Sequence, residues 1–364
     1  MLLIIRILIR NRKSNYMGRI KGVPGDISIA GEKARELIAK SKGVSYMAMA
    51  RKLLEDNPLI FKDVAHARSL IRWHTGTLKS NGRTNPNPVS FINNFTRENP
   101  YGLPPSHEEF RAPFILPKVN NNILVLSDLH IPYHSIDALN VAIKYGLENK
   151  INTIFINGDL LDCHQLSKYE KDPKKRSTVQ ELTAAKEFLQ TLRKLFPKAQ
   201  IYYHLGNHDI RYERFINIHR LMLQDLFGDG GEMDLETRLE LIKTKVTLIG
   251  DKQITHCGIT GKLSMHHGHY IFRGATSPVS PAKTILDKMS MSMICGHTHK
   301  ISEYTKTDGR GVISTSWSTG SLAELLPDYA PMANNYAHGF AHAKIKDSGD
   351  FVVRNFRIYN GKIL

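Results

Sequence analysis

Side chains that bind metals stand directly after an apolar run in the middle of the chain. The run "ILVLS" at residues 123–127 is followed by Asp128 and His130. Two residues apart on an extended chain, these side chains point to the same side. A carboxylate and an imidazole placed in this way suit one divalent metal ion. Such a pair is also common by chance at the end of a strand, so its meaning depends on partners elsewhere in the sequence.

Four further segments repeat the arrangement of an apolar run, a glycine turn and ligand-type side chains. They read "NGDLLD", "LGNHD", "MHHGHY" and "CGHTHK". Because the carboxyl ends of parallel strands lie along one edge of a sheet, we expect the five segments to converge there. Besides Asp128 and His130, they contribute Asp159, Asp162, Asn207, His208, Asp209, His267, His297 and His299.

This donor set favours a catalytic metal centre. Neutral imidazoles, carboxylates and one carboxamide suit borderline divalent ions such as Mn, Fe, Zn or Ni. A structural zinc site would favour thiolates, whereas the three cysteines form no Cys-x-x-Cys pair and are typical of a reducing, cytoplasmic setting. A carboxylate that bridges two ions would hold them roughly 3.5–4 Å apart, which is the geometry of a two-metal hydrolytic site.

The blocks D-x-H, G-D-x-x-D, G-N-H-D, H-G-H and G-H-x-H, in this order, resemble the calcineurin-like metallophosphoesterase superfamily over about residues 120–364. The resemblance implies a four-layer α/β/β/α sandwich with two divalent metal ions, Mn²⁺ ahead of Fe, Zn or Ni. It implies phosphoester hydrolysis by a metal-bridging hydroxide. It assigns one metal to Asp128, His130, Asp159 and His299, with Asp159 as the bridge, and the second metal to Asn207, His267 and His297. It makes His208 a general acid or transition-state stabiliser that Asp162 orients.

Four residues are expected to contact the substrate. His134 and His269 stand beside ligand blocks, and the sequence leaves open whether they are outer ligands, substrate contacts or ordinary supporting histidines. Arg211 follows "GNHD" and either binds a phosphate or pairs with Glu213. Arg72 belongs to the basic N-terminal part of the chain.

Two of the sequence blocks depart from the pattern of one branch of the superfamily. Its protein Ser/Thr phosphatases carry "GDxxDRG" and "GNHE". This chain has Cys163 in place of that arginine and Asp209 in place of that glutamate. The departure disfavours a phosphoprotein substrate.

The elements that position the blocks alternate between strand and helix. Helices are predicted at 136–149 and 178–196, with more helical material between 210 and 258. An α/β half followed by a strand-rich half indicates a layered α/β domain. The predicted strands are 123–127, 153–157, 201–205, 246–250, 263–266, 291–295, 312–316, 340–345 and 351–358.

The 364 residues are expected to form a small domain, a linker and a large domain. The small domain, residues 1–79, is basic and helical, and is compatible with a helix-turn-helix module. Residues 80–118 are rich in Pro and Asn and indicate an extended linker, and residues 119–364 form the metallophosphoesterase domain. The helices predicted in the small domain are 31–40, 45–56 and 64–74.

Positive charge is concentrated in the N-terminal part. The whole chain carries a net charge of +16, and residues 1–100 hold 18 Lys+Arg and 7 Asp+Glu, which is 18 − 7 = +11. This asymmetry favours a polyanionic partner, nucleic acid ahead of an anionic membrane, with a solvated basic arm as the remaining alternative. In the third predicted helix, Arg68, Arg72 and Trp73 could pair with phosphate or stack on bases.

Three functions are compatible with these features. The first is a nuclease or phosphodiesterase acting on DNA or RNA, a layout that also resembles phosphoesterases of phage and other mobile genomes. The second is a phosphatase of nucleotides, small phosphometabolites or phosphoproteins. The third is a DNA-binding regulator with an inactive metallo-domain, which the full ligand set disfavours.

The first residues, "MLLIIRILIRNRK", do not read as a membrane span. Arg6 and Arg10 interrupt the apolar run, which falls short of the roughly 20 residues that cross a bilayer. No positive region precedes the run and no small-residue cleavage site follows it, as a signal peptide would require. We expect translation to begin at Met17.

Overall fold

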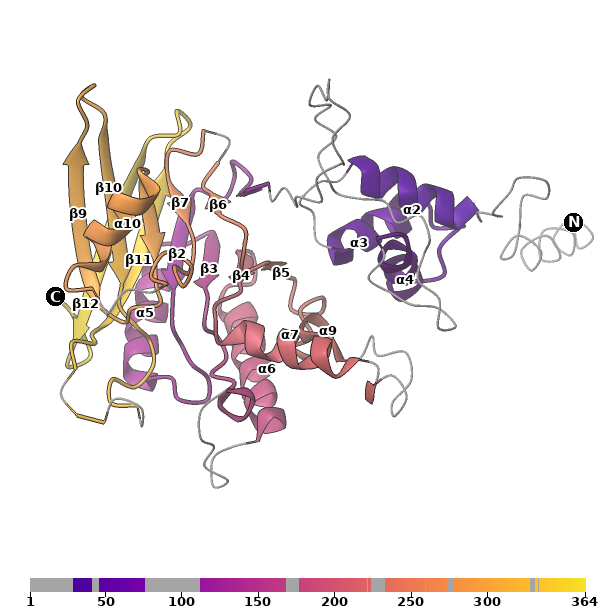
Figure 1. Ribbon diagram of the computed structural model, residues 1–364, viewed down its shortest axis with the longest axis horizontal. Helices are drawn as coiled ribbons and strands as arrows, with labels where there is room; N and C mark the ends of the chain where they lie inside the picture. Colours follow the sequence, from indigo (N-terminus) through magenta and orange to yellow (C-terminus); the bar gives the residue numbers. More distant parts are fainter. Residues whose placement is uncertain are drawn as a thin grey trace, which may run out of the picture. The chain divides into compact units, whose positions relative to one another are not determined.

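The chain divides into two compact units, Met1–Ala112 and Pro113–Leu364 (Figure 1). The computed structural model describes residues 29–40, 46–75, 112–167, 177–220, 222–223, 233–258, 260–273, 278–327, 331–332 and 334–364. The expected start at Met17 and most of the expected linker, residues 80–111, lie outside the described residues.

Within its described residues, 29–40 and 46–75, the first unit has three helices around a small apolar core. Ile38, Leu53, Phe61 and Ile71 are among the core side chains, and none is more than 2% exposed. The helices confirm the three that the apolar spacing predicts, and their bounds are α2 (Ile29–Lys40), α3 (Tyr46–Asp56) and α4 (Val64–His74).

The connection between α3 and α4 runs over residues 57–63. Asp63 ends it as the N-cap of α4, where its side chain accepts a 2.7 Å hydrogen bond from the backbone N–H of His66. The connection is longer than the turn of about three or four residues in a helix-turn-helix motif. The helix-turn-helix assignment therefore stays a prediction.

The second unit is built on two β-sheets. In the larger sheet, β2 to β5 run parallel, and β11 pairs antiparallel with β2. The strand order is β13-β12-β11-β2-β3-β4-β5. The bounds are β2 (Asn122–Leu126), β3 (Thr153–Asn157), β4 (Gln200–His204), β5 (Val246–Ile249), β11 (His338–Ile345), β12 (Phe351–Tyr359) and β13 (Lys362–Ile363).

The smaller sheet has the order β1-β6-β7-β8-β10-β9. Its strands are short near β1 and long near β9, which pairs antiparallel with β10. The bounds are β1 (Phe114–Ile115), β6 (Thr255–His256), β7 (Ser264–Met265), β8 (Met293–Cys295), β9 (Ile301–Thr307) and β10 (Ile313–Thr319).

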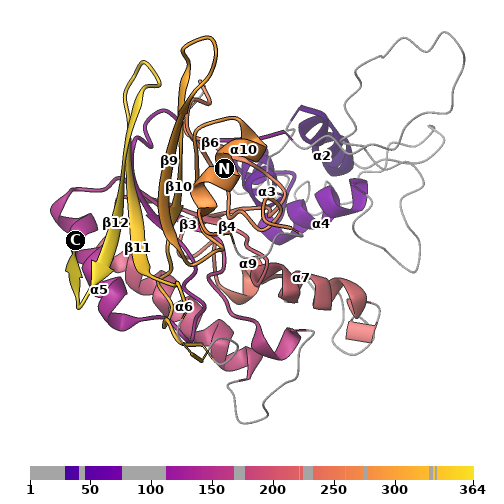
Figure 2. The ribbon, with the colours of Figure 1, turned by 60° about the vertical axis from the view of Figure 1, so that its left-hand side comes forward.

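Helices cover the outer faces of the two sheets, as the opposite positions of α6 and α10 in Figures 1 and 2 illustrate. Leu139 of α5 and Leu189 of α6 belong to the core cluster that includes Ile154 of β3, whereas α10 packs on β8 to β10. The helices are α5 (Ile136–Glu148), η2 (His164–Leu166), α6 (Thr178–Leu195), α7 (Asp209–Ile218), α9 (Leu235–Arg238) and α10 (Pro281–Met289).

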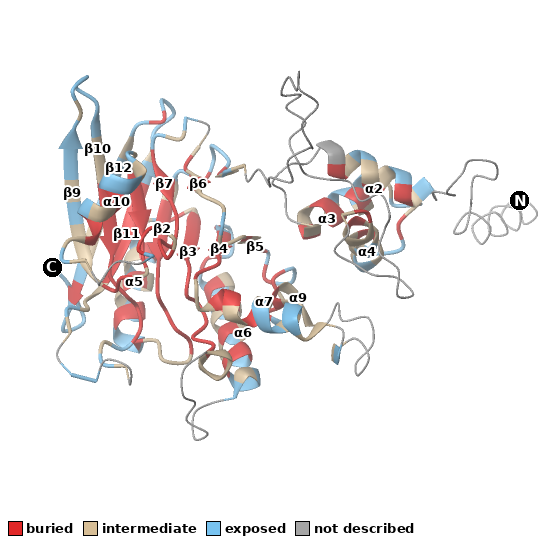
Figure 3. Cartoon of the chain, viewed as in Figure 1, coloured by how far each residue is buried: buried red, intermediate tan, exposed pale blue. Residues whose placement is uncertain are grey.

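The two sheets face each other across a second apolar cluster. Val125 and Phe155 of the larger sheet meet Met265, Ile294 and Trp317 of the smaller one, and all are at most 4% exposed. Figure 3 shows the central strands mostly buried. The layers are thus helix, sheet, sheet and helix, which confirms the predicted α/β/β/α sandwich.

Each predicted strand overlaps an observed one, and α5 and α6 confirm the two predicted helices. The predicted linker extends too far toward the C-terminus. Within it, β1 pairs in parallel with β6, and Leu116 is fully buried between the sheets, so these residues belong to the second unit. Among the described helices, none is long and apolar enough to cross a membrane.

Candidate metal centre

Five turns bring the ligand blocks together at the carboxyl ends of β2, β3, β4, β7 and β8. In the part of the chain that the structure describes, the positions of the donor atoms define three overlapping groups, each able to hold a metal ion. The groups are Asp128, His130 and His299; His130, Asp159 and His208; and Asp159, His267 and His297.

Five of the predicted ligands have left-handed backbone conformations. Their φ angles are 55° at Asp128, 48° at His130, 51° at Asp159, 69° at His297 and 56° at His299. Such conformations are unfavourable for residues other than glycine and persist only where the surrounding structure imposes them. Here they turn the side chains of neighbouring strands toward one point.

The first group gathers around Asp128, whose carboxylate is fully buried. It accepts hydrogen bonds from the backbone N–H of His297 at 2.9 and 3.0 Å, and His299 Nε2 lies 3.3 Å from Oδ1. His130 Nδ1 lies 3.0 Å from Asp162 Oδ1, which leaves the lone pair of Nε2, on the side of His299, available to bind a metal ion. The Nε2 atoms of His130 and His299 are 3.2 Å apart, a spacing that a shared cation would stabilise.

The third group is organised by His267. Its Nδ1 donates to the carbonyl of Asn157 at 2.9 Å, so Nε2 carries the lone pair. That Nε2 lies 3.1 Å from Asp159 Oδ2 and 3.2 Å from Asn207 Oδ1. Burial lowers the pKa of His267, but the charge of Asp159 outweighs it and raises the pKa to about 9. The site therefore favours a positive charge at this atom, which a metal ion would supply.

Asp159 belongs to the second and third groups and connects them. Its Oδ2 lies 3.1 Å from His267 Nε2 and 3.7 Å from His130 Nε2, and the residue is 1% exposed. Burial raises the pKa of this carboxyl, but the nearby histidines outweigh burial and hold it well below its usual range. An ionised, shared carboxylate between two imidazole groups fits the bridge of a two-metal site.

His208 lies against the same centre, with its ring centroid 4.4 Å from that of His130. Its Nδ1 donates to the backbone carbonyl of Asp162 at 2.8 Å, while the Asp162 carboxylate is 3.4 Å away. The Asp162 carboxylate is closer to His130, at 3.0 Å. Asp162 therefore holds His208 mainly through its backbone and orients His130 through its side chain.

Arg211 completes this part of the site. Its Nη1 donates to the Asp162 carbonyl at 3.0 Å, and its Nη2 lies 3.0 Å from His208 Nε2. The guanidinium thus lies beside the catalytic candidate rather than in the alternative pairing with Glu213. Because Arg211 can only donate, its contact requires His208 Nε2 to be unprotonated.

Asp209 has a role that the sequence alone did not reveal. Its fully buried carboxylate accepts hydrogen bonds from the backbone N–H groups of Asp159, Leu161 and Gly206, at 2.8, 2.9 and 2.7 Å. It therefore ties the turn after β3 to the turn after β4. The only sequence signal was its place in the G-N-H-D block.

Two glycines allow the turns to approach the ligands. A Cβ atom at Gly206 would lie 2.1 Å from Asp159 Oδ1, and one at Gly296 would lie 2.4 Å from Asp128 Oδ2. Any side chain at these positions would displace a carboxylate of the centre.

The remaining predicted contacts occupy different places. His269 is buried, with its ring 5.5 Å from that of His267. His134 is half-buried, and its backbone forms an isolated β-bridge with Ala323. Arg72 is half-buried on α4, in the other unit. The structure thus brings His269 to the centre, and His134 to the segment after β10.

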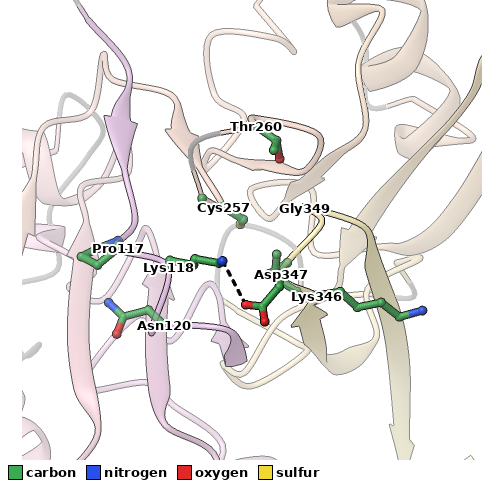
Figure 4. A pocket seen from close by; sticks show the side chains of 10 residues that line it. Pro117, Lys118, Asn120, Cys257, Thr260, Lys346, Asp347 and Gly349 are labelled. Carbon is green, nitrogen blue, oxygen red and sulfur yellow. Dashed lines mark ion pairs between the residues drawn. The ribbon is translucent and has the colours of Figure 1, made fainter.

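A separate cavity of about 220 Å³ lies at the opposite ends of the strands, next to the start of β2 (Figure 4). Lys118 and Asp347 form an ion pair of 3.2 Å at its edge, and the buried thiol of Cys257 lines it. None of its lining residues belongs to the metal-binding groups.

The fold and the donor set together define a metal-dependent phosphoesterase. Residues 122–301 match the family model of the calcineurin-like phosphoesterases, so this part of the chain belongs to that family and is a phosphoester hydrolase. Members of the family typically bind two divalent metals, and the Asp, His and Asn donors described above fit such ions. No match was found among curated protein sequences.

Several solved structures are similar to this chain at low sequence identity. Vacuolar protein sorting 29 from Cryptosporidium parvum is 14% identical, with a TM-score of 0.38 over 67% of this chain and 94% of that chain. The phosphoesterase YfcE from E. coli is 14% identical, with a TM-score of 0.32 over 64% and 98%. A dimetal phosphatase from Danio rerio is 14% identical, with a TM-score of 0.32 over 65% and 96%. The family assignment rests on the sequence match.

Proposed function

We propose that the chain hydrolyses phosphoester bonds in nucleic acid with two divalent metal ions, Mn²⁺ the first choice. The observation that carries this proposal is the convergence of donor atoms around Asp159. One ion is assigned to Asp128, His130, Asp159 and His299. The other is assigned to Asp159, Asn207, His267 and His297. When bound, such ions polarise phosphoryl oxygens and lower the pKa of a water molecule.

The protein side chains prepare the centre for that chemistry. The hydrogen bonds of His130 to Asp162 and of His267 to Asn157 fix the ring orientation and present Nε2 to the ions. Burial lowers the pKa of His208, but the charge of Asp159 and the Asp162 side chain outweigh it and raise the pKa. When Nε2 of His208 is protonated, it no longer accepts the hydrogen bond from Arg211. We assign to His208 the transfer of this proton to the leaving oxygen.

The N-terminal unit supports nucleic acid as the substrate class. Residues 1–100 carry the +11 charge excess, and α4 bears Arg68, Arg72 and Trp73. We assign residues 1–79 to polyanion binding and the second unit to hydrolysis. Cys163 and Asp209, which depart from the Ser/Thr phosphatase pattern, favour this assignment over a phosphoprotein substrate.

The test compares the full chain with a chain that starts at Pro113, the first residue of the second unit. Both are assayed with Mn²⁺ on p-nitrophenyl phosphate, bis-p-nitrophenyl phosphate, single- and double-stranded DNA, and RNA. We expect the shorter chain to retain turnover of the small diester and to lose nucleic-acid turnover, with a weaker salt dependence. Equal nucleic-acid turnover by both chains would refute the role of the N-terminal unit.

The metal assignment has a separate test. Asp159→Asn removes the shared carboxylate charge, so turnover should fall at least about 1000-fold and Mn²⁺ binding by calorimetry should weaken in parallel. Asp347→Asn, at a side chain that is 89% exposed beside the other cavity, is the matched control. A fully active Asp159→Asn variant would exclude the bridging role.

A further inference from the structure

A run of side chains leads from the metal centre to the surface on the side of His267. The His269 ring centroid lies 5.5 Å from that of His267, and the Tyr270 ring follows 4.1 Å from His269. The Arg273 guanidinium carbon lies 4.8 Å from the Tyr270 ring centroid, over the ring. Since His269 is buried, Tyr270 half-buried and Arg273 exposed, the run connects the centre to solvent.

His269 requires a partner that the described part of the chain does not supply. The residue is 7% exposed, and neither ring nitrogen has a hydrogen-bond partner. Asp251 Oδ2 lies 3.9 Å from Nε2, which is within ion-pair range but beyond hydrogen-bond distance. Buried imidazoles are rarely left unpaired. An unpaired imidazole beside the assigned ligand His267 points to a bound molecule on this side of the centre.

Two arginines supply positive charge at the outer end of the run. Arg273 contacts the Tyr270 ring and forms no ion pair within the described part of the chain. Arg214 of α7 is exposed and lies close enough to act on Tyr270. Burial and Asp251 raise the pKa of Tyr270 to about 12, and the charges of Arg273 and Arg214 oppose that rise.

Two acidic side chains lie near Tyr270: burial is outweighed at Asp251, where His269 and Tyr270 lower the pKa to about 2, whereas Glu213 carries a weaker charge. Asp251 accepts a 2.6 Å hydrogen bond from the Tyr270 hydroxyl, which also fixes the ring beneath Arg273. Burial, followed by the charge of Asp251, raises the pKa of Glu213 to about 7, so this carboxyl is only partly ionised at neutral pH. A guanidinium held over an aromatic ring presents its N–H fork to an anion such as phosphate.

We propose that Arg273 and Arg214 bind a second phosphate of the substrate while the phosphate to be hydrolysed lies at the metal centre, with His269 contacting the substrate between them. This inference rests on the proposed function and narrows it. The preferred substrate is a nucleic acid with a phosphate beyond the scissile one, not a mononucleotide ester.

The experiment uses the full chain with Mn²⁺ and two substrates that differ by one phosphate. They are thymidine 5′-(p-nitrophenyl phosphate) and the same ester with an added 3′-phosphate, so the leaving group is unchanged. The wild-type chain should show the higher kcat/KM on the bisphosphate. Arg273→Gln should lower kcat/KM about 10-fold on the bisphosphate and less than about 2-fold on the monophosphate, as expected for loss of a charge-assisted contact at an exposed site.

Further variants separate the roles of the three residues. Arg214→Gln should act in the same direction as Arg273→Gln, and His269→Ala should reduce kcat/KM on both substrates. Arg357→Gln, at an exposed arginine of β12, is the matched control and should leave the ratio of the two substrates unchanged. Arg214, Arg273 and Arg357 are exposed, so their glutamine variants are expected to fold like the wild type.

The outcomes distinguish the inference from the proposed function. If the wild-type chain hydrolyses neither ester, the proposed phosphodiester activity fails. If it hydrolyses both with the same kcat/KM, or if Arg273→Gln lowers both equally, only the second phosphate site is overturned. A bisphosphate preference that Arg273→Gln and added salt both remove supports the site.

Discussion

Three backbone N–H groups converge on one buried carboxylate, that of Asp209. Burial and the charge of Asp159 raise its pKa, so the three hydrogen bonds offset an unfavourable desolvation. Two of the donors are Asp159 and Gly206, which belong to different metal-binding turns. Asp209 thus contributes to the centre through backbone geometry, without being a ligand in the proposed assignment.

Replacing this carboxylate should destabilise the fold and weaken metal binding together. Asp209→Ala leaves three buried N–H groups unpaired, so we expect the free energy of unfolding to fall by about 3 kcal/mol or more. Asp209→Asn keeps one acceptor oxygen and should lose roughly half as much. Urea unfolding at pH 7.5 measures both. Asp347→Ala, at an exposed residue, should change stability by less than about 0.5 kcal/mol, and an equal effect of Asp209→Ala would contradict the role.

Elements were predictable where their residues are apolar on both faces. β3 is buried at all five positions and coincides with the predicted strand 153–157. β9 was not predicted, because "ISEYTKT" is an edge strand with mostly half-buried or exposed residues and no apolar run. β1 and β6 have two residues each, too few for a sequence pattern.

The metal centre could be predicted only in part. The types and order of the ligands could be read from the blocks, and the structure groups the donors of Asp128, His130, Asp159, His267, His297 and His299. The pairing of Asp162 with His130, and of Arg211 with His208, could not be read. These contacts depend on how turns from different strands pack, which the spacing along one strand does not encode.

The turn after β4 should be intolerant of any side chain. Because a Cβ at Gly206 would lie 2.1 Å from Asp159 Oδ1, Gly206→Ala must displace the shared carboxylate or the turn. We expect Mn²⁺-dependent turnover to fall at least about 100-fold, since displacing a catalytic group by about 1 Å has an effect of this size. Gly309→Ala is the matched control, because a Cβ there would meet no atom within 4 Å. Wild-type turnover by Gly206→Ala would show that the turn can move without loss.

At the scale of the whole second unit, its early and late segments pair in one sheet. β11, from the C-terminal part, inserts beside β2 in the larger sheet. His342 of β11 joins three elements, with Nδ1 2.8 Å from the Tyr145 hydroxyl of α5 and Nε2 2.6 Å from Asn122 Oδ1 of β2. Burial, together with the charges of Lys344 and Arg354, lowers its pKa from 6.5 to about 4.

This histidine should make stability depend on pH far from the metal centre. The unfolded chain takes up the proton near pH 6.5 and the folded chain only near pH 4, so the contribution of His342 is complete above pH 6.5 and is lost as pH falls toward 4. His342→Gln removes this titration. The stability advantage of the wild type over His342→Gln, measured by urea unfolding with EDTA present, should therefore shrink by about 1–2 kcal/mol between pH 7.5 and 4.5. Because other titrating groups are common to both chains, they cancel in the difference. An advantage that stays constant over this range would show that His342 titrates alike in the folded and unfolded chains.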